Sequence, residues 1–205
     1  MVNTNRLSLG RMKKGFTSFN MNSFSYKKEN FYCEGVSIKE LCKIKETPFY
    51  LYSSKCIKDK YHSLESRLKG TNCLIAYAVK ANSNIAILKL LGSLGAGADV
   101  VSLGELRKVN VAGIPNEKIV YSGVGKKDIE IAFAIEAGIL QFNVESYQEL
   151  KRIAIIAKDK CQTANIAIRV NPDVVAGGHP KISTGKKHDK FGVSIEEAVK
   201  AYKFA

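Results

Sequence analysis

From residue 72 onward the sequence repeats one pattern five times: a short apolar run, a polar loop and a longer amphipathic stretch. Short apolar runs closed by turn formers are typical of buried strands, whereas amphipathic stretches of about ten residues or more are typical of helices. Strands that alternate with such helices form parallel β/α units. The pattern predicts strands at residues 74–79, 95–102, 118–122, 140–144 and 164–171, and helices at residues 55–70, 85–94, 103–112, 128–137, 146–158 and from 195.

Two architectures are built from parallel β/α units, the closed (β/α)8 barrel and the open doubly wound sheet. No G-x-G-x-x-G motif follows an expected strand, which disfavours a dinucleotide-binding sheet. Every expected strand instead ends on a polar side chain, and a barrel carries its chemistry at the carboxyl ends of its strands. These strand-end residues are Lys80, Asp99, Ser122, Asn143 or Glu145, and Arg169. The fold class predicted is therefore α/β, a TIM-type (β/α)8 barrel.

The predicted barrel is incomplete. Only five of its eight β/α units are visible, and a closed barrel takes about 250 residues. The last helix-like stretch, residues 194–205, carries no stop signal. We therefore expect a barrel truncated at residue 205, with an open sheet edge.

Lys80 closes the first of these apolar runs. Strand alternation would place it on one face with Ala78 and Asn82, and would place Tyr77 and Val79 on the other. A lysine among small residues at a strand end would be shielded from water, which favours its neutral amine. A neutral amine can attack an aldehyde. The alternative is a lysine that caps the strand in solvent, and spacing alone favours that alternative.

The amino-terminal segment, residues 1–28, carries six basic side chains and no acidic one. Such a segment is typical either of an organelle transit peptide or of a translation start placed too far upstream, with Met21 as the true first residue. We favour the second interpretation and expect a disordered extension.

Residues 29–54 are predicted to form a lead-in segment before the partial barrel at residues 55–205. Ser37 and Glu40 have the spacing of a capping box, which would open a short helix. The aromatic and apolar residues 49–52 favour a strand.

Composition excludes several classes of function. The net charge is +13, but the lysines are spread along the chain without a basic stripe interleaved with aromatic residues, which disfavours nucleic-acid binding. No apolar run approaches the roughly 18 residues that a membrane span needs. The five cysteines are odd in number and never form a C-x-x-C pair, which indicates reduced thiols in a cytoplasmic protein rather than disulfides or a zinc site.

The stretch Tyr-Ala-Val-Lys-Ala-Asn at residues 77–82 resembles the pyridoxal-phosphate lysine motif of fold-type III enzymes. These enzymes include alanine racemases and the ornithine, arginine and diaminopimelate decarboxylases. Further motifs make the chain most similar to the diaminopimelate decarboxylases. They lie at residues 34–36, 47–53, 97–106, 142–146, 169–173, 179–185 and 190–192. The resemblance covers about residues 30–205, which would be the amino-terminal part of such an enzyme.

The resemblance implies that Lys80 holds pyridoxal 5′-phosphate covalently, and that Asp99 and Arg169 lie beside the cofactor. Judged from the residues alone, Asp99 is a strand-end cap and Arg169 part of a structural ion pair. Glu105 lies six residues past Asp99, where capping a helix is as suitable a role as a place in the site.

Histidines are not expected in the site. Neither His62, His179 nor His188 lies in the His-x-Gly-Ser pattern from which the family takes its ring-stacking histidine. That histidine, the phosphate-binding glycines, the acidic partner of the pyridine nitrogen and the Cys-Glu substrate segment are expected beyond residue 205. Residues 1–205 alone are therefore expected to be inactive.

The activity that the resemblance implies is decarboxylation of meso-2,6-diaminopimelate at its D-configured centre, which gives L-lysine. One alternative is a related decarboxylase that acts on ornithine, arginine or carboxynorspermidine. A second is a non-catalytic pyridoxal-phosphate-binding barrel protein, and a basic RNA-binding domain is the most distant. The partners implied are a small amino-acid substrate and a second copy in a homodimer, with no metal, no nucleic acid and no membrane.

Overall fold

The computed structural model describes residues 23–172, 174 and 192–205. The chain divides into two compact units, residues 1–59 and residues 60–205. Each unit has a sheet of its own, and each is described by itself.

The first unit is a small antiparallel sheet followed by a short helix. Its elements are β1 (Phe24–Lys27), β2 (Asn30–Cys33), β3 (Val36–Ser37) and α1 (Ile38–Ile44). β1 pairs along its whole length with β2 although it lies within the predicted disordered extension. That prediction is therefore wrong for β1, whereas residues 1–22 lie outside the described part.

Aromatic side chains support the β1–β2 hairpin. The ring of Phe31 lies 4.7 Å from that of Tyr26 and 5.9 Å from that of Phe24, between ring centroids. Cross-strand aromatic pairs contribute about 0.2–1 kcal/mol each. α1 begins after Ser37 as predicted, but the Ser37 hydroxyl makes no capping bond. The predicted capping box is wrong, because Glu40 forms an exposed ion pair within the helix instead.

Helix α2 (Ser54–Arg67) begins at a carboxylate that the small sheet supplies. Glu34 accepts hydrogen bonds from the backbone N–H of Lys55 at 3.0 Å and from the Ser53 hydroxyl at 2.7 Å. Unpaired N–H groups make a helix amino terminus favourable for negative charge. These hydrogen bonds hold the pKa of Glu34 below its ordinary value.

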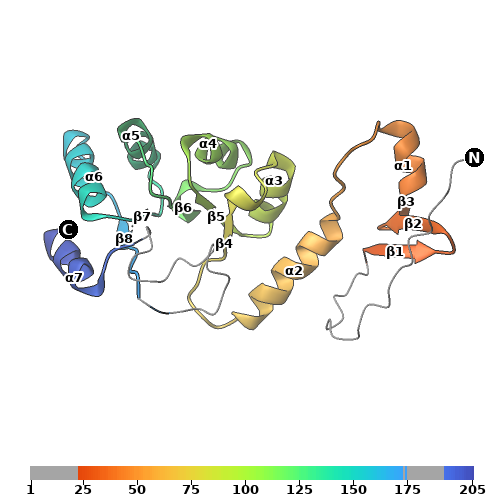
Figure 1. Ribbon diagram of the computed structural model, residues 1–205, viewed down its shortest axis with the longest axis horizontal. Helices are drawn as coiled ribbons and strands as arrows, with labels where there is room; N and C mark the ends of the chain where they lie inside the picture. Colours follow the sequence, from red (N-terminus) through yellow and green to blue (C-terminus); the bar gives the residue numbers. More distant parts are fainter. Residues whose placement is uncertain (1–22, 173, 175–191) are drawn as a thin grey trace, which may run out of the picture. The chain divides into compact units, whose positions relative to one another are not determined.

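The second unit contains a five-stranded parallel sheet whose strands lie in sequence order. The strands are β4 (Ala76–Ala78), β5 (Gly97–Val100), β6 (Ile119–Tyr121), β7 (Gln141–Val144) and β8 (Ile166–Ile168). The helices that follow them are α3 (Ile85–Ser93), α4 (Leu103–Val111), α5 (Asp128–Ala137), α6 (Tyr147–Asp159) and α7 (Ile195–Phe204). Figure 1 shows α3, α4, α5 and α6 in a row along one side of the strands.

The order of the strands decides between the two candidate architectures. A doubly wound sheet reverses its strand order at a switch point and carries helices on both faces, whereas a barrel adds each strand beside the last with its helices outside. The order β4-β5-β6-β7-β8 never reverses. The second unit is therefore a run of consecutive β/α units of a (β/α)8 barrel, and the predicted fold class, an incomplete barrel, is confirmed.

Strand alternation gives this sheet two different faces. The face toward the helices is apolar and almost fully buried, and comprises Ala98, Val100, Ile119, Tyr121, Phe142, Val144 and Ile168. Its partners in the same core, from the helices, include Leu88, Leu106, Ile131 and Ile153. Burial of one large apolar side chain contributes about 1.5–3 kcal/mol. The alternate residues Asp99, Asn143 and Ala167 line a pocket on the other face, which leaves that face available for chemistry.

A further strand position begins beside β8. Val170 and Val193 form a parallel bridge, with the Val193 N–H donating to the Arg169 carbonyl at 2.9 Å and the Asn171 N–H donating to the Val193 carbonyl at 2.7 Å. Gly192 has a φ of +80°, and a Cβ there would lie 2.8 Å from the Arg169 carbonyl oxygen. Glycine meets both demands, so the chain can approach β8 closely enough to pair.

The predicted strands and helices of the barrel unit all form, and the main difference lies at the first strand. β4 ends at Ala78 and gives way to a 3₁₀ turn, η1 (Val79–Ala81), so strand alternation does not extend to Lys80. In the first unit the strand predicted at residues 49–52 is wrong. These residues pair with no strand in the described part of the chain, and Tyr50 is 89% exposed.

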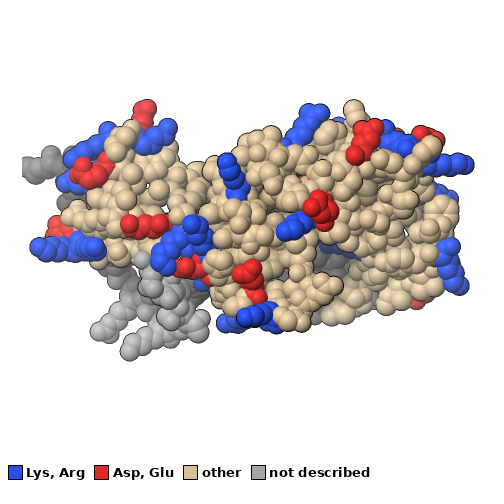
Figure 2. Space-filling model, turned by 180° about the vertical axis from the view of Figure 1, so that it is seen from behind, with Lys and Arg blue, Asp and Glu red and all other residues tan. Residues whose placement is uncertain are grey.

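On the face that Figure 2 shows, Lys and Arg side chains lie in small separate groups with Asp and Glu among them. Exposed pairs such as Lys55–Asp59, at 2.6 Å, contribute about 0–1 kcal/mol. Among the described residues no helix combines the length and apolar character that a membrane crossing requires.

Gly97 of β5 provides a test of strand packing, because a Cβ there would lie 2.2 Å from the carbonyl oxygen of Lys118. Gly97→Ala is expected to lower the free energy of unfolding by about 1–3 kcal/mol, although alanine usually stabilises a strand. Gly125→Ala is the matched control, since a Cβ there meets no atom within 4 Å. Urea denaturation of the protein measures both variants, and equal stabilities would contradict the close approach.

Candidate functional site

A polar pocket opens at the carboxyl end of the parallel sheet, with a cavity volume of about 420 Å³. It is lined by Lys80, Asp99, Ser122, Asn143, Glu145, Ala167, Ile168 and Arg169. Parallel strands bring their carboxyl ends to one edge, which is why residues far apart in sequence meet here. Small-molecule pockets typically measure about 300–1,000 Å³. Lys80, Asp99 and Arg169 come from three different β/α units and line this pocket together, so their predicted convergence is confirmed.

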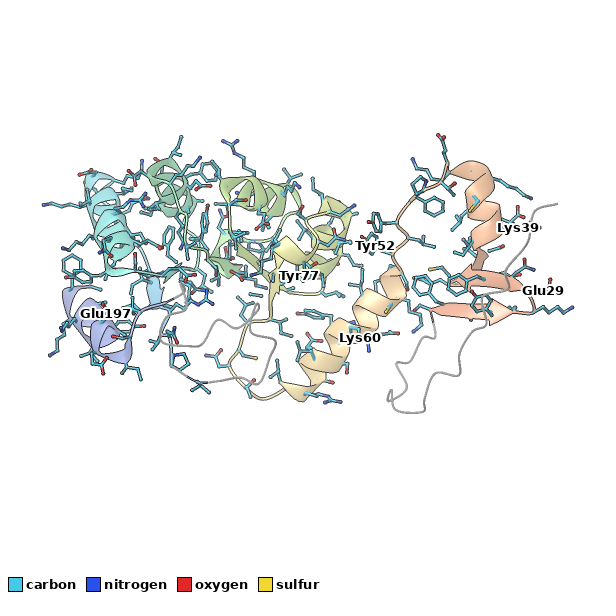
Figure 3. The ribbon with its side chains drawn as sticks, in the orientation of Figure 1. Glu29, Lys39, Tyr52, Lys60, Tyr77 and Glu197 are labelled. Atoms are coloured by element: carbon cyan, nitrogen blue, oxygen red, sulfur yellow. The ribbon has the colours of Figure 1, made fainter. Side chains whose placement is uncertain are left out.

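Lys80 reaches the pocket from η1 rather than from a strand. The residue is exposed, so the prediction of a dry setting is wrong for this structure. The reason is the early end of β4 at Ala78, which places Lys80 in a turn beyond the sheet. Val79 is fully buried in the core, and Tyr77 packs against the same core from β4 (Figure 3). Both neighbours therefore face the helix layer, as predicted.

Asp99 is held by a hydrogen-bond chain that crosses three strands. The Ser122 hydroxyl donates to the Asp99 carboxylate at 2.5 Å, and the Asn143 side-chain amide donates to Ser122 at 2.9 Å. The Gln141 amide in turn donates to the Asn143 carbonyl oxygen at 2.9 Å. Every donor points toward Asp99, so the chain orients the carboxylate.

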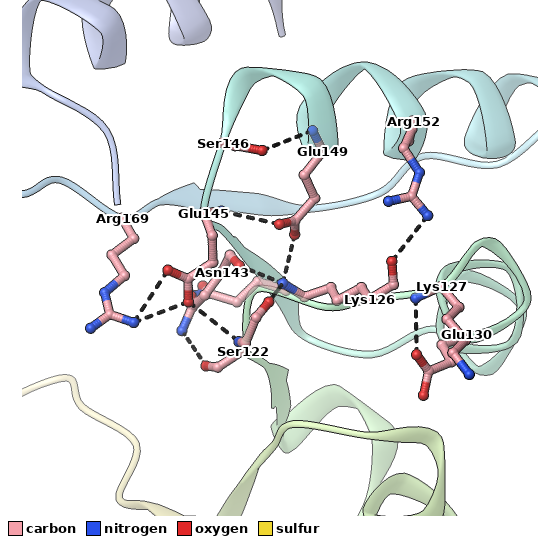
Figure 4. A network of polar contacts seen from close by, with 12 residues as sticks. Ser122, Lys126, Lys127, Glu130, Asn143, Glu145, Ser146, Glu149, Arg152 and Arg169 are labelled. Atoms are coloured by element: carbon pink, nitrogen blue, oxygen red, sulfur yellow. Dashed lines mark hydrogen bonds and ion pairs between the residues drawn. The ribbon is translucent and has the colours of Figure 1, made fainter. Parts of the chain in front are cut away.

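Arg169 forms an ion pair with Glu145 at the pocket. One guanidinium nitrogen, Nη1, donates to both Glu145 oxygens, at 3.0 and 3.2 Å (Figure 4). The Glu145 side chain is 3% exposed and that of Arg169 42% exposed, so the pair joins the protein interior to the pocket opening. The backbone N–H of Gly123 also donates to Glu145, at 3.3 Å. The ion pair expected from the residues alone is present, and it lies in the pocket.

A second ion pair behind this one was not predicted from the sequence. Lys126 and Glu149 lie 2.6 Å apart between Nζ and Oε1, with side chains 1% and 7% exposed. Glu149 is the third residue after the N-cap Ser146 of α6. A glutamate at that spacing is typical of a capping box, so the sequence assigns it to the helix end rather than to the site.

Glu105 has a structural role at the start of α4 and does not line the pocket. Its carboxylate accepts from the Val101 N–H at 2.8 Å, while its own N–H donates to the hydroxyl of Ser102, the N-cap of α4. Of the histidines, His62 is exposed on α2 and pairs with Glu65 at 3.1 Å. The other two, at positions 179 and 188, lie outside the described residues.

The residues of the pocket fit pyridoxal phosphate, a flat ring that carries an aldehyde and negative charge. Lys80 supplies a primary amine, Asp99 a carboxylate and Arg169 a guanidinium group. Ala167, a further lining residue, is small, which leaves room for a ring. In the described part of the chain no three or more His, Cys, Asp or Glu side chains are placed to hold a metal ion.

Comparison with known proteins gives the same answer over most of the chain. Residues 54–205 match the family model described as pyridoxal-dependent decarboxylase, pyridoxal binding domain. The diaminopimelate decarboxylase of Aquifex aeolicus is 51% identical over 180 residues, which cover 88% of this chain and 42% of that protein. The chain thus spans less than half the length of this relative.

Solved structures of decarboxylases are also similar to this chain. Diaminopimelate decarboxylase from Helicobacter pylori, complexed with L-lysine, has a TM-score of 0.79 and 47% identity, covering 82% of this chain and 42% of that one. The lysine/ornithine decarboxylase from Vibrio vulnificus, complexed with cadaverine, covers 82% of this chain and 40% of that one, at a TM-score of 0.67 and 23% identity, and so shows the fold alone. The strand order, the pocket at the strand ends and the family match agree: the chain belongs to the pyridoxal-dependent decarboxylases, and residues 54–205 correspond to their pyridoxal binding domain.

Proposed function

We propose that the full-length polypeptide carrying this chain removes carbon dioxide from the D-configured centre of meso-2,6-diaminopimelate and yields L-lysine, the last step of lysine biosynthesis. The observation that carries the proposal is the meeting of Lys80, Asp99 and Arg169 in one pocket of a chain 51% identical to a diaminopimelate decarboxylase. The L-lysine bound in the Helicobacter pylori enzyme supports a product of this kind.

Three residues would hold pyridoxal 5′-phosphate in this pocket. Lys80 would bond to it through its amine, and its exposed position leaves the amine within reach of a substrate. Asp99, oriented by Ser122, would place a carboxylate beside the ring. Arg169, oriented by Glu145, would place positive charge at the pocket opening. When bound, the cofactor supplies an electron sink for the electron pair left by decarboxylation.

The remaining features of the proposal concern the whole protein. Residues 29–54 would associate with a carboxyl-terminal β-domain, and residues 55–205 would form part of the barrel. The active form would be a homodimer. The proposed location is the cytoplasm, which the free thiols of all five cysteines support.

Covalent labelling tests the role of Lys80. Borohydride reduction of the full-length protein with pyridoxal phosphate is expected to fix a pyridoxyl group to Lys80, as peptide mass spectrometry would show. Lys80→Met is expected to lose this label and to lower kcat by about a thousandfold or more, because the covalent anchor is gone. Lys89→Met, at an exposed position of α3, is the control and should keep both. A label on another lysine of the wild-type protein would sink the assignment.

Substrate choice tests the reaction. The full-length protein is expected to release one carbon dioxide and one L-lysine for each meso-diaminopimelate consumed, as gas release and chiral chromatography would show. The L,L isomer, which lacks the D-configured centre, should remain unchanged. Faster turnover of ornithine or arginine would instead favour the related decarboxylases.

The chain of donors to Asp99 gives a further test. Ser122→Ala removes the hydroxyl that donates to Asp99, and a hydrogen bond to a charged group contributes about 1.5–3 kcal/mol. The Kd for pyridoxal phosphate, followed by visible absorbance, is therefore expected to rise at least about tenfold. Ser93→Ala is the control, because the Ser93 hydroxyl donates to the backbone carbonyl of Leu90 within α3. An unchanged Kd for Ser122→Ala would show that Asp99 needs no orientation.

A further inference from the structure

Lys126 lies behind the pocket and does not line it. Its ammonium group donates to the Glu149 carboxylate at 2.6 Å and to the backbone carbonyls of Gly123 and Asn143, both at 2.8 Å (Figure 4). A lysine ammonium has three donors, so each one is used. The side chain therefore ties together the loop after β6, the end of β7 and the first turn of α6.

Two buried carboxylates meet beside this ammonium group. Glu145 and Glu149 are both buried, each 6% exposed when the whole residue is counted. Glu149 accepts from the Glu145 backbone N–H at 3.4 Å, so its carboxylate lies between Lys126 and the Glu145 backbone. Buried charges are costly unless each is paired. Lys126 matches Glu149 from the helix side and Arg169 matches Glu145 from the pocket side, which makes the four charges neutral together.

We propose that Lys126 is a positioning residue, which sets the place of Arg169 in the pocket through Glu149 and Glu145. It holds Glu145 in two ways. Through Glu149 it fixes the backbone N–H of Glu145. Through the Gly123 carbonyl it fixes a residue whose own N–H donates to the Glu145 carboxylate, at 3.3 Å. Glu145 then presents both oxygens to Arg169.

The same ammonium group also reaches the chain that orients Asp99. It holds the backbone carbonyl of Asn143, whose side-chain amide donates to Ser122 and through it to Asp99. Both polar residues proposed to flank the cofactor thus depend on Lys126, which itself touches neither. The inference rests on the proposed function, because Asp99 and Arg169 matter there as cofactor-binding residues.

Removing the charges of both Lys126 and Glu149 separates an effect on the position of Glu145 from an effect on stability. Lys126→Met alone leaves Glu149 buried without its cation, and the protein is expected to lose much of its stability. In K126M/E149Q no unpaired charge remains, and the amide oxygen introduced at position 149 can still accept from Glu145, so the melting temperature is expected to return toward the wild-type value. Lys127→Met, the same substitution at the exposed neighbouring position, is the matched control and should behave as wild type.

Two measurements on K126M/E149Q, made in the full-length protein, then decide the proposal. Without cofactor, hydrogen exchange of peptides that cover residues 122–126 and 143–146 is expected to be about tenfold faster than in the wild-type protein. The Kd for pyridoxal phosphate is expected to rise about tenfold. Loss of a residue that supports a ligand-binding side chain weakens binding by about 10–100-fold, and this value is at the lower end of that range. If K126M/E149Q regains its stability and also has the exchange rates and the Kd of the wild-type protein, Lys126 contributes to stability alone. That outcome would overturn the proposal.

The remaining outcomes are also decisive. If the wild-type protein takes up no pyridoxal phosphate, the proposed function fails, while hydrogen exchange still tests the positioning of Glu145. If K126M/E149Q does not fold, Lys126→Arg takes its place, because arginine keeps the charge but its planar group does not reproduce three tetrahedral donors. Wild-type exchange and affinity in that variant would likewise count against the proposal.

Discussion

Parallel strand pairing in sequence order is the constraint on which the barrel unit depends. Each strand lies beside the one before it, so every carboxyl end reaches the same edge of the sheet. Alternation then divides the side chains between an apolar face under the helices and a face of small and polar residues. The first face stabilises the fold through burial, and the second is free to carry Asp99 and its neighbours. The core and the site thus use opposite faces of the same short strands.

The carboxylates near the strand ends each have a hydrogen-bond donor or a cation as a partner within the protein. Asp99 receives a directed chain of hydrogen bonds, and the buried carboxylates of Glu145 and Glu149 each have a cation. Such matching is what allows charge to persist at low exposure, where screening by water is weak. It also couples the helix layer to the pocket, since Lys126 and Glu149 belong to the helix side and Arg169 to the opening. A pocket arranged this way keeps its charged groups oriented before any ligand arrives.

Much of the site was predictable because strand ends are visible in sequence. Lys80 and Arg169 follow apolar runs and Asp99 lies near the end of one, and parallel topology makes their convergence follow. The exposure of Lys80 was not predictable, because it depends on β4 ending at Ala78 rather than continuing through the lysine. Lys126 was missed for a different reason. It lies in the loop after β6, and only the packing of α6 brings its partner Glu149 close to it.

The sequence by itself determined the order of strands and helices, the apolar face of each strand and the polar residue at each strand end, because these depend on local periodicity. Tertiary structure alone decided which polar residues became partners. The hydrogen bonds from Ser122 to Asp99 and from Lys126 to Glu149 each join residues 23 positions apart. Such contacts arise from strand register and helix docking, which no local pattern encodes. Burial then gives them their strength, because a charge withdrawn from water must find its partner within the protein.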